Sequence, residues 1–181
     1  MRWMKPGRDG EIAGDLAAMR RYARSLTRDD QDADDVVQTA LVRAMERHRT
    51  FRPDRDRRRW LLAIVHNVFI SGRRRLAAEG RRNARFADTL VGHVEPEQDQ
   101  RARLNQVARA FAELPDHHRA VMHLIIIEGM RYQEAARVLD VPIGTVMSRL
   151  ARARSALRGL EAGLKKEERQ ARLRLVGKED D

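Results

Sequence analysis

The side chains best suited to chemistry include three closely spaced aspartates. Asp32, Asp34 and Asp35 lie in "TRDDQDADD", ahead of a strongly basic stretch, and could suggest a Mg²⁺-dependent nuclease site. Acids at positions i, i+2 and i+3 do not converge on one face of a helix. Asp and Thr are also typical of helix N-termini, where carboxylates suit the positive end of the helix dipole. We therefore expect these acids to begin a helix rather than to hold a metal ion.

Three histidines raise the second chemical possibility, a transition-metal site. His117, His118 and His123 lie close together in "LPDHHRAVMH", but no fourth ligand of suitable spacing is evident and the chain has no cysteine. We expect these histidines to belong to a solvated helix start. The sequence shows no nucleophile–base pair, glycine-rich phosphate loop or cofactor signature. It therefore predicts no metal, no cofactor and no enzymatic activity.

The charge of the chain favours a polyanionic partner. The 37 Lys and Arg outnumber the 27 Asp and Glu, which gives a net charge of +10. The excess is uneven: residues 28–46 hold two Arg and six acids, a net −4, whereas residues 52–85 hold eleven Arg and three acids, a net +8. An acidic face followed by a basic face indicates two different partners.

The C-terminal stretch "YQEAARVLDVPIGTVMSRLARARSALR", residues 132–158, predicts two helices around a short turn. In the second helix, apolar residues share one stripe, which would face a core: Val146, Leu150, Ala153 and Leu157. The opposite face is small and polar apart from one arginine, so a DNA major groove could approach it closely. A helix-turn-helix with merely solvated charges is the structural alternative.

Three further helical patterns precede this region, between residues 10 and 76. They carry apolar residues at spacings of three and four, around residues 12–26, 33–44 and 60–69. Pro53 and its neighbours would end the second helix, and the third would run from about Arg58 to Arg75. Trp60 lies on the apolar stripe of the third helix, which favours a core position over a base-stacking one.

The sequence thus predicts an all-α chain of two small helical domains joined by a flexible linker. The expected divisions are residues 10–77, a linker over 78–100, a helix-turn-helix domain over 101–160 and a charged tail over 161–181. A helix is expected to start near Pro115 or Asp116, and Gly129 to end it. No apolar run approaches the roughly 20 residues that span a bilayer, and no signal peptide is evident, so a cytoplasmic location is expected.

Three stretches in order resemble the extracytoplasmic-function (group 4) sigma factors of bacterial RNA polymerase. They are "DADDVVQTALVRAM", "RRWLLAIVHNVFISGRRR" and "LPDHHRAVMHLIIIEGMRYQEAARVLDVPIGTVMSRLARARSALR", and the likeness covers about residues 15–157. The resemblance implies that the first domain binds core polymerase and the −10 promoter element. It implies that the second domain binds the −35 element.

The resemblance also implies roles for individual residues. In such proteins the acidic second helix docks on the clamp helices of the largest polymerase subunit, here through Asp34, Asp35, Gln38 and Arg43. The −10 element would be bound by Arg55, Arg58, Arg59, Asn67, Ser71, Arg73 and Arg74. The −35 element would be bound by Thr145, Met147, Ser148, Arg149, Ala151, Arg152 and Arg154. Ser71 departs from the family, where an acidic residue is common.

The resemblance further implies an anti-sigma factor as a partner, since such proteins usually hold these sigma factors inactive. Opening of the −10 region would need a place for an extruded base and cations along the single strand, and Asn67 is our first choice for a base contact. The alternative is an ordinary helix-turn-helix regulator that binds duplex DNA and is not a polymerase subunit. The acidic helix and the linker favour the sigma factor.

Overall fold

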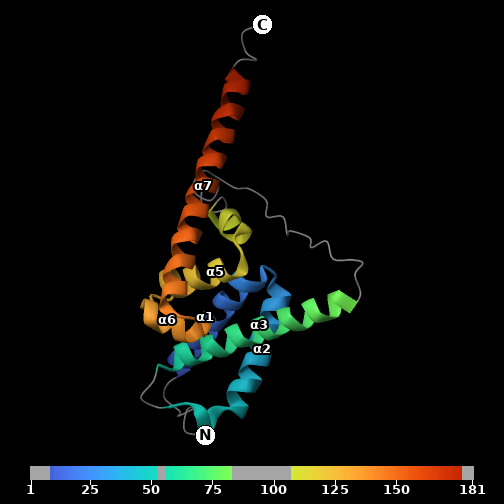
Figure 1. Ribbon diagram of the computed structural model, residues 1–181, viewed down its shortest axis with the longest axis vertical. Coiled ribbons are helices and arrows are strands. Elements are labelled where there is room, and N and C mark those ends of the chain that lie inside the picture. The colour runs from blue at the N-terminus through green and yellow to red at the C-terminus, as the bar shows by residue number, and fades with distance from the viewer. Residues whose placement is uncertain (1–8, 53–55, 83–106, 177–181) are drawn as a thin grey trace.

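The computed structural model describes residues 9–52, 56–82 and 107–176, and all its regular elements are helical (Figure 1). The first domain comprises α1 (Asp9–Thr27), α2 (Asp30–Glu46), the short 3₁₀ turn η1 (His48–Thr50) and α3 (Arg57–Arg82). The second domain begins with a helical segment over residues 107–113. It continues with α5 (Asp116–Met122), the π turn η2 (His123–Ile127), α6 (Tyr132–Leu139) and α7 (Ile143–Val176). The predicted all-α class with a helix-turn-helix is confirmed.

In the first domain, α1, α2 and α3 pack pairwise around one core. The apolar side of α2 is made largely of small residues, with Ala33, Ala40 and Ala44 buried, which lets its backbone approach the neighbouring helices closely. Its other buried neighbours include Leu26 of α1 and Leu62 of α3. The burial follows the apolar spacing that predicted the three helices.

The turn between α1 and α2 is defined by the backbone and by one side chain. Arg28 adopts a left-handed conformation with φ of 65°, which ends α1. Asp29 caps α2, since its carboxylate accepts a hydrogen bond of 2.8 Å from the backbone N–H of Asp32. The predicted capping role of this acidic stretch is thereby confirmed for Asp29. The helix α2 ends at Glu46, earlier than the expected stop at Pro53.

In the second domain, the chain turns at the expected places. The helix α5 begins at Asp116, and Gly129, with φ of +66°, ends the π turn that follows it. Glu134 accepts a 2.8 Å bond from the backbone N–H of Arg131 and so stabilises the start of α6. Asp140, with φ of 52°, forms the left-handed turn before α7, a conformation that Asp tolerates better than most residues.

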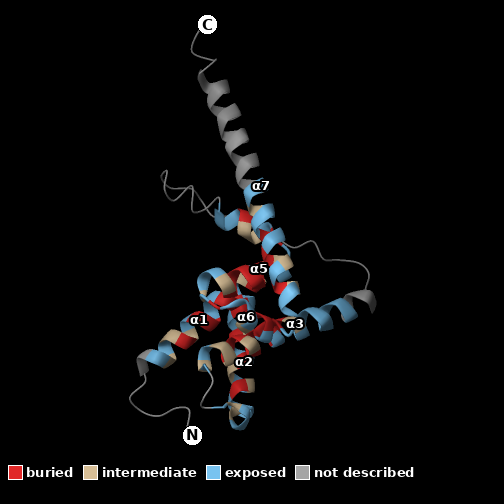
Figure 2. Ribbon diagram, turned by 60° about the vertical axis from the view of Figure 1, so that its left-hand side comes forward, coloured by how far each residue is buried: buried red, intermediate tan, exposed pale blue. Residues whose placement is uncertain are grey.

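The two domains pack against each other, with α5 beside the end of α1 and α6 across α3. Figure 2 shows the buried residues gathered where α1, α3, α5 and α6 meet, and they form one continuous core.

Two helices are longer than the sequence suggested. The helix α3 continues to Arg82, past the expected end near Arg75, so the first residues of the expected linker are helical. The helix α7 continues to Val176, into the expected tail, and both ends are visible in Figure 1. The rest of the expected linker, from residue 83, lies outside the described residues. Among those described, no helix is long and apolar enough to cross a membrane.

Candidate nucleic-acid interface

The helix α7 turns its apolar stripe inward. Val146, Leu150 and Ala153 are buried, and Leu157 packs at the edge of the same core. The side chains expected to meet a major groove lie on the other side of the helix. Among them, Met147, Ala151, Arg152 and Arg154 are exposed, and Thr145, Ser148 and Arg149 are half-buried. The Ser148 hydroxyl donates to the carbonyl of Thr145 at 3.1 Å, so it lies along its own helix.

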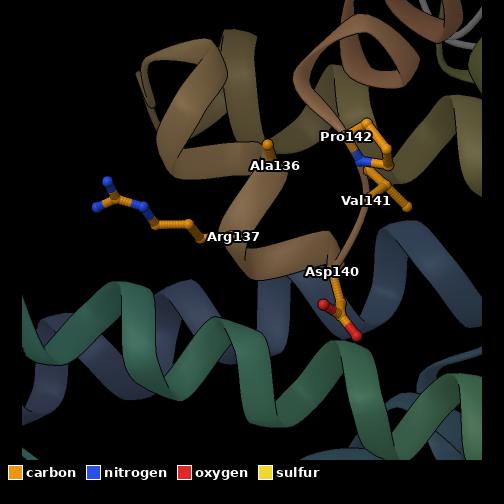
Figure 3. Close-up of a pocket in the computed structure, with 5 residues that line it drawn as sticks. All are labelled: Ala136, Arg137, Asp140, Val141 and Pro142. Atoms are coloured by element: carbon orange, nitrogen blue, oxygen red, sulfur yellow. The ribbon is translucent and has the colours of Figure 1, made fainter.

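The turn between α6 and α7 borders a shallow depression on the surface. It is lined by Ala136, Arg137, Asp140, Val141 and Pro142, and in Figure 3 the Arg137 side chain extends away from it. Pro142 closes the turn, and its carbonyl accepts the first backbone bond of α7, from Thr145 at 2.9 Å. This turn fixes the direction in which α7 leaves α6.

The start of α3 is anchored to α1 by a buried carboxylate. Asp15 is only 7% exposed and accepts from Arg57 Nε at 2.6 Å and from Arg58 Nε at 3.2 Å. A charge-assisted pair of this kind holds both partners in one orientation. Arg58, one of the expected −10 contacts, therefore has a structural role in addition to any contact with DNA. Arg55 lies outside the described residues.

Two other expected −10 contacts reach into the second domain. Arg59 Nη1 lies 2.6 Å from Glu134 Oε1 of α6, and Arg73 Nε lies 3.3 Å from Asp116 Oδ2 of α5. The remaining three, Asn67, Ser71 and Arg74, are exposed. Trp60 is half-buried beside Phe51, with ring centroids 5.2 Å apart, and packs against the core as expected.

The acidic helix α2 presents a mixed outer face. Asp34, Asp35 and Gln38 are exposed, and Arg43 is half-buried. Val42 and Met45, which sequence reasoning missed, are about half exposed. At about 100° per residue they fall on the side of α2 that carries Gln38. The sequence could have revealed these two exposed apolar side chains, because both residues lie outside the apolar stripe of this helix.

A buried polar cluster also escaped the sequence analysis. The Tyr22 hydroxyl and His66 Nδ1 share a 3.0 Å hydrogen bond, and the Tyr22 ring lies 5.1 Å from the ring of His123. His123 was expected to be solvated, but it is buried, since η2 turns it into the core beneath α1. Its Nε2 lies 3.5 Å from the Glu128 carboxylate, which is also paired with Arg21 at 2.9 Å.

Burial determines the charge of this cluster. Burial, and to a smaller extent the positive charge of Arg149, together lower the pKa of His66 to about 4. Burial likewise lowers the pKa of His123 to about 4, although Glu128 acts in the opposite direction. Burial raises the pKa of Tyr22. All three side chains are therefore uncharged at neutral pH.

The exposed acids and the first two histidines do not assemble into a metal site in the described part of the chain. No group of three His, Cys, Asp or Glu with suitable geometry occurs there. The rings of His117 and His118 lie edge to face, with centroids 4.3 Å apart. Asp34 faces Arg20 at 3.7 Å, and Asp30 pairs with Arg24 at 2.9 Å.

Family models match both domains of the chain. Residues 12–66 match the Sigma2 domain of PhyR, and residues 104–157 match Sigma-70, region 4.

Curated relatives extend the likeness across most of the sequence. The chain is 31% identical over 151 residues to the ECF RNA polymerase sigma factor EcfG of Rhodopseudomonas palustris, covering 83% of this chain and 82% of that one. It is 35% identical over 142 residues to the ECF RNA polymerase sigma factor SigM of Mycobacterium tuberculosis, covering 77% and 69% of the two chains.

Two solved structures resemble most of the fold. The sigma factor RpoE of Bartonella quintana, in complex with the anti-sigma factor NepR, matches with a TM-score of 0.72 and 29% identity over 84% of this chain and 95% of that one. CnrH, in complex with the cytosolic domain of CnrY, matches with a TM-score of 0.60 and 30% identity over 85% of this chain and 86% of that one.

Proposed function

Because the chain belongs to the extracytoplasmic-function sigma factors of bacterial RNA polymerase, we propose that its two domains divide three binding tasks between them. These tasks are docking on core polymerase, capture of the −10 element and reading of the −35 element. The chain directs the polymerase to promoters and helps to open the −10 region, while the chemistry of RNA synthesis belongs to the polymerase. It would act in the cytoplasm as a member of the two-domain group 4 type.

The −35 element would be read by the outer face of α7. The observation that carries this assignment is that the small side chain of Ala151 is exposed on this face of α7. The side chains of Arg152 and Arg154, within one helical turn of it, are exposed as well. Ala151 and Met147 offer apolar contact to thymine methyl groups, and Arg152 offers paired donors to a guanine or a phosphate. Arg149 and Arg154 would bind phosphates and fix the position of the helix on the duplex.

The −10 element would be captured along α3. Asn67 and Ser71 are exposed and lie one helical turn apart, so one face of the helix presents a hydrogen-bonding amide beside a hydroxyl. An extruded base loses several kcal/mol of stacking and pairing, which such contacts must offset. Arg59, Arg73 and Arg74 would bind the backbone phosphates on either side.

Core polymerase would be bound by the outer face of α2. Its carboxylates at Asp34 and Asp35 lie N-terminal to the exposed side chains of Val42 and Met45. A surface with an apolar centre and a charged rim is typical of specific protein interfaces. The partner proposed is the clamp-helix coiled coil of the largest subunit.

An anti-sigma factor is the further partner that we propose. Of the structural relatives, RpoE was solved with the anti-sigma factor NepR, and CnrH was solved with the cytosolic domain of CnrY. A bound inhibitor would have to cover part of the surfaces that promoter DNA and polymerase need.

Promoter fragments that separate the two elements test these assignments. An Asn67→Ala chain, bound to core polymerase, should lose about tenfold or more of its affinity for a −10 single strand, as expected for one base contact. Its affinity for a −35 duplex should not change. A matched Gln133→Ala change on α6, at an exposed position outside the proposed sites, should alter neither affinity. If Asn67→Ala weakened −35 binding instead, the assignment of α3 would be wrong.

A further inference from the structure

Two adjacent histidines of α5 have no role in the functions proposed above. The rings of His117 and His118 meet edge to face, with centroids 4.3 Å apart. His117 is exposed, whereas His118 is half-buried, and its Nδ1 has no hydrogen-bond partner within the described residues. Because α5 packs along α7, the pair lies beside the helix that is proposed to read the −35 element.

Two arginines of α7 act on this pair. Arg149 and Arg152 are three residues apart, so they are neighbours on one side of the helix. Burial, and to a smaller extent the positive charges of these two arginines, lower the pKa of both histidines below the usual value. His117 also lowers the pKa of His118. Both rings are therefore mostly uncharged at neutral pH, in a cluster that already carries two arginine charges.

Little negative charge balances this cluster. The acid that acts on the histidine pair is Asp116. Its two carboxylate oxygens already lie 2.7 Å from Arg119 Nη2 and 3.3 Å from Arg73 Nε. Arg149 and Arg152 form no ion pair with any acid in the part of the chain that the structure describes. A group of positive charges without internal counter-charges attracts an anion from outside the chain.

The position of the cluster favours a DNA backbone phosphate as this anion. Arg152 is exposed on the outer face of α7, where the −35 duplex would lie, and its charge reaches both histidines. A helix that enters a major groove is flanked by phosphates of the two strands. At an exposed surface water competes for a free oxyanion, whereas a docked duplex holds its phosphates in place beside the helix.

We propose that His117, with His118 packed against it, binds a backbone phosphate of the −35 duplex and takes up a proton from the solvent as it does so. The proposal rests on the −35 function proposed for α7. The phosphate favours the charged imidazolium, and it also offsets the arginine charges that disfavour it. His118 is less suited to the proton, since a buried Nδ1–H would have no acceptor. Binding therefore takes up about one proton per chain.

The affinity for a −35 duplex, measured across pH, tests the uptake of a proton. One proton changes affinity by at most about tenfold per pH unit, so the chain, bound to core polymerase, should bind about tenfold more tightly at pH 6 than at pH 8. His117→Gln keeps a polar side chain that cannot be protonated, and should lose this gain. Any pH dependence of the polymerase itself remains in this variant. His48→Gln, on η1 of the first domain, is the matched control and should behave as wild type. Equal pH dependence of the wild-type and His117→Gln chains would overturn the proposal.

The salt dependence of the same affinities distinguishes a phosphate contact from a loss of folding. One added contact between a cation and a phosphate steepens the slope of log affinity against log salt by about 0.9. The wild-type slope should be steeper by this amount at pH 6 than at pH 8, and the slope of His117→Gln should not change with pH. Discrimination against a scrambled duplex should be unaltered, because phosphate contacts carry no sequence information. A wild-type slope that does not change with pH would refute the phosphate contact.

Nuclear magnetic resonance of the free chain tests the cluster without DNA, since the sequence has only six histidines to follow. An Arg149→Gln, Arg152→Gln variant should raise the pKa of His117 toward its usual value, and an unchanged pKa would contradict the cluster. If the wild-type chain on core polymerase does not distinguish a −35 duplex from a scrambled one at any pH, the function proposed for α7 is wrong. If it does so without proton uptake, only the role of His117 is wrong.

Discussion

Arg119 gives the sharpest test of how the domains are held together. Its guanidinium donates to four carbonyls, those of Ser25, Leu26, Ala112 and Leu114, and to the Asp116 carboxylate. An Arg119→Leu change removes this donor from the carbonyls of Ser25, Leu26 and Leu114, whereas the Ala112 carbonyl keeps its bond from Arg28 and the Asp116 carboxylate keeps Arg73. Each buried acceptor left unpaired costs about 1–3 kcal/mol, and breaking a buried charged pair costs about 3–5 kcal/mol. Because water and small movements of the backbone would satisfy some of these acceptors, we expect the free energy of unfolding to fall by about 4 kcal/mol.

Urea unfolding followed by far-ultraviolet circular dichroism measures this loss directly. The control is Arg24→Leu on α1, whose arginine is exposed and pairs with the exposed Asp30, and which should change stability by no more than about 0.5 kcal/mol. Arg119→Lys should fall between the two, since a point charge on a flexible stem cannot reproduce the forked set of donors. A loss below about 1 kcal/mol for Arg119→Leu would contradict this structural role of Arg119, because surface substitutions cost as little.

Three further predictions follow from the remaining surfaces and from the buried histidines. Arg152→Ala should weaken binding of the −35 duplex by about 1–3 kcal/mol, and −35-dependent initiation should fall, while core polymerase still binds. Loss of core binding would contradict the domain assignment. Val42→Asp, at a half-exposed position, should weaken core binding in a pull-down without lowering the melting temperature. The pKa values of about 4 for His66 and His123 lie below the unfolded value of about 6.5, so the unfolded chain binds more protons in acid. Stability is therefore complete above pH 6.5 and should fall by about 2 kcal/mol per histidine by pH 5, and a flat urea-unfolding profile over that range would count against their burial.

The helices could be read from the sequence because their burial follows local spacing. The stripe that begins at Val146 predicted the inward face of α7, and Asp29 predicted the start of α2. The resemblance identified the family, and the similarity of most of the chain to sigma factors favours the polymerase subunit over the regulator that was left open.

The contact between the domains could not be read in this way. Arg119 looks like any polar residue near a helix start, and only the carbonyls at the end of α1, 94 residues away, explain its burial. His123 was wrongly expected to be solvated for a similar reason, because its ring lies against Tyr22 of the first domain, which is itself hydrogen-bonded to His66. Helix ends were also misjudged: α3 continues to Arg82 through residues without an apolar stripe, where local spacing carries no signal.

As a sigma factor, this chain should convert core polymerase into a promoter-specific enzyme. The most direct measurement is in vitro transcription with purified core polymerase, with and without the chain, on a pool of promoter fragments from its own genome. Discrete start sites should appear only with the chain and should share sequences near −10 and −35. The absence of any new start site, together with binding of the chain to duplex DNA in the absence of polymerase, would contradict it.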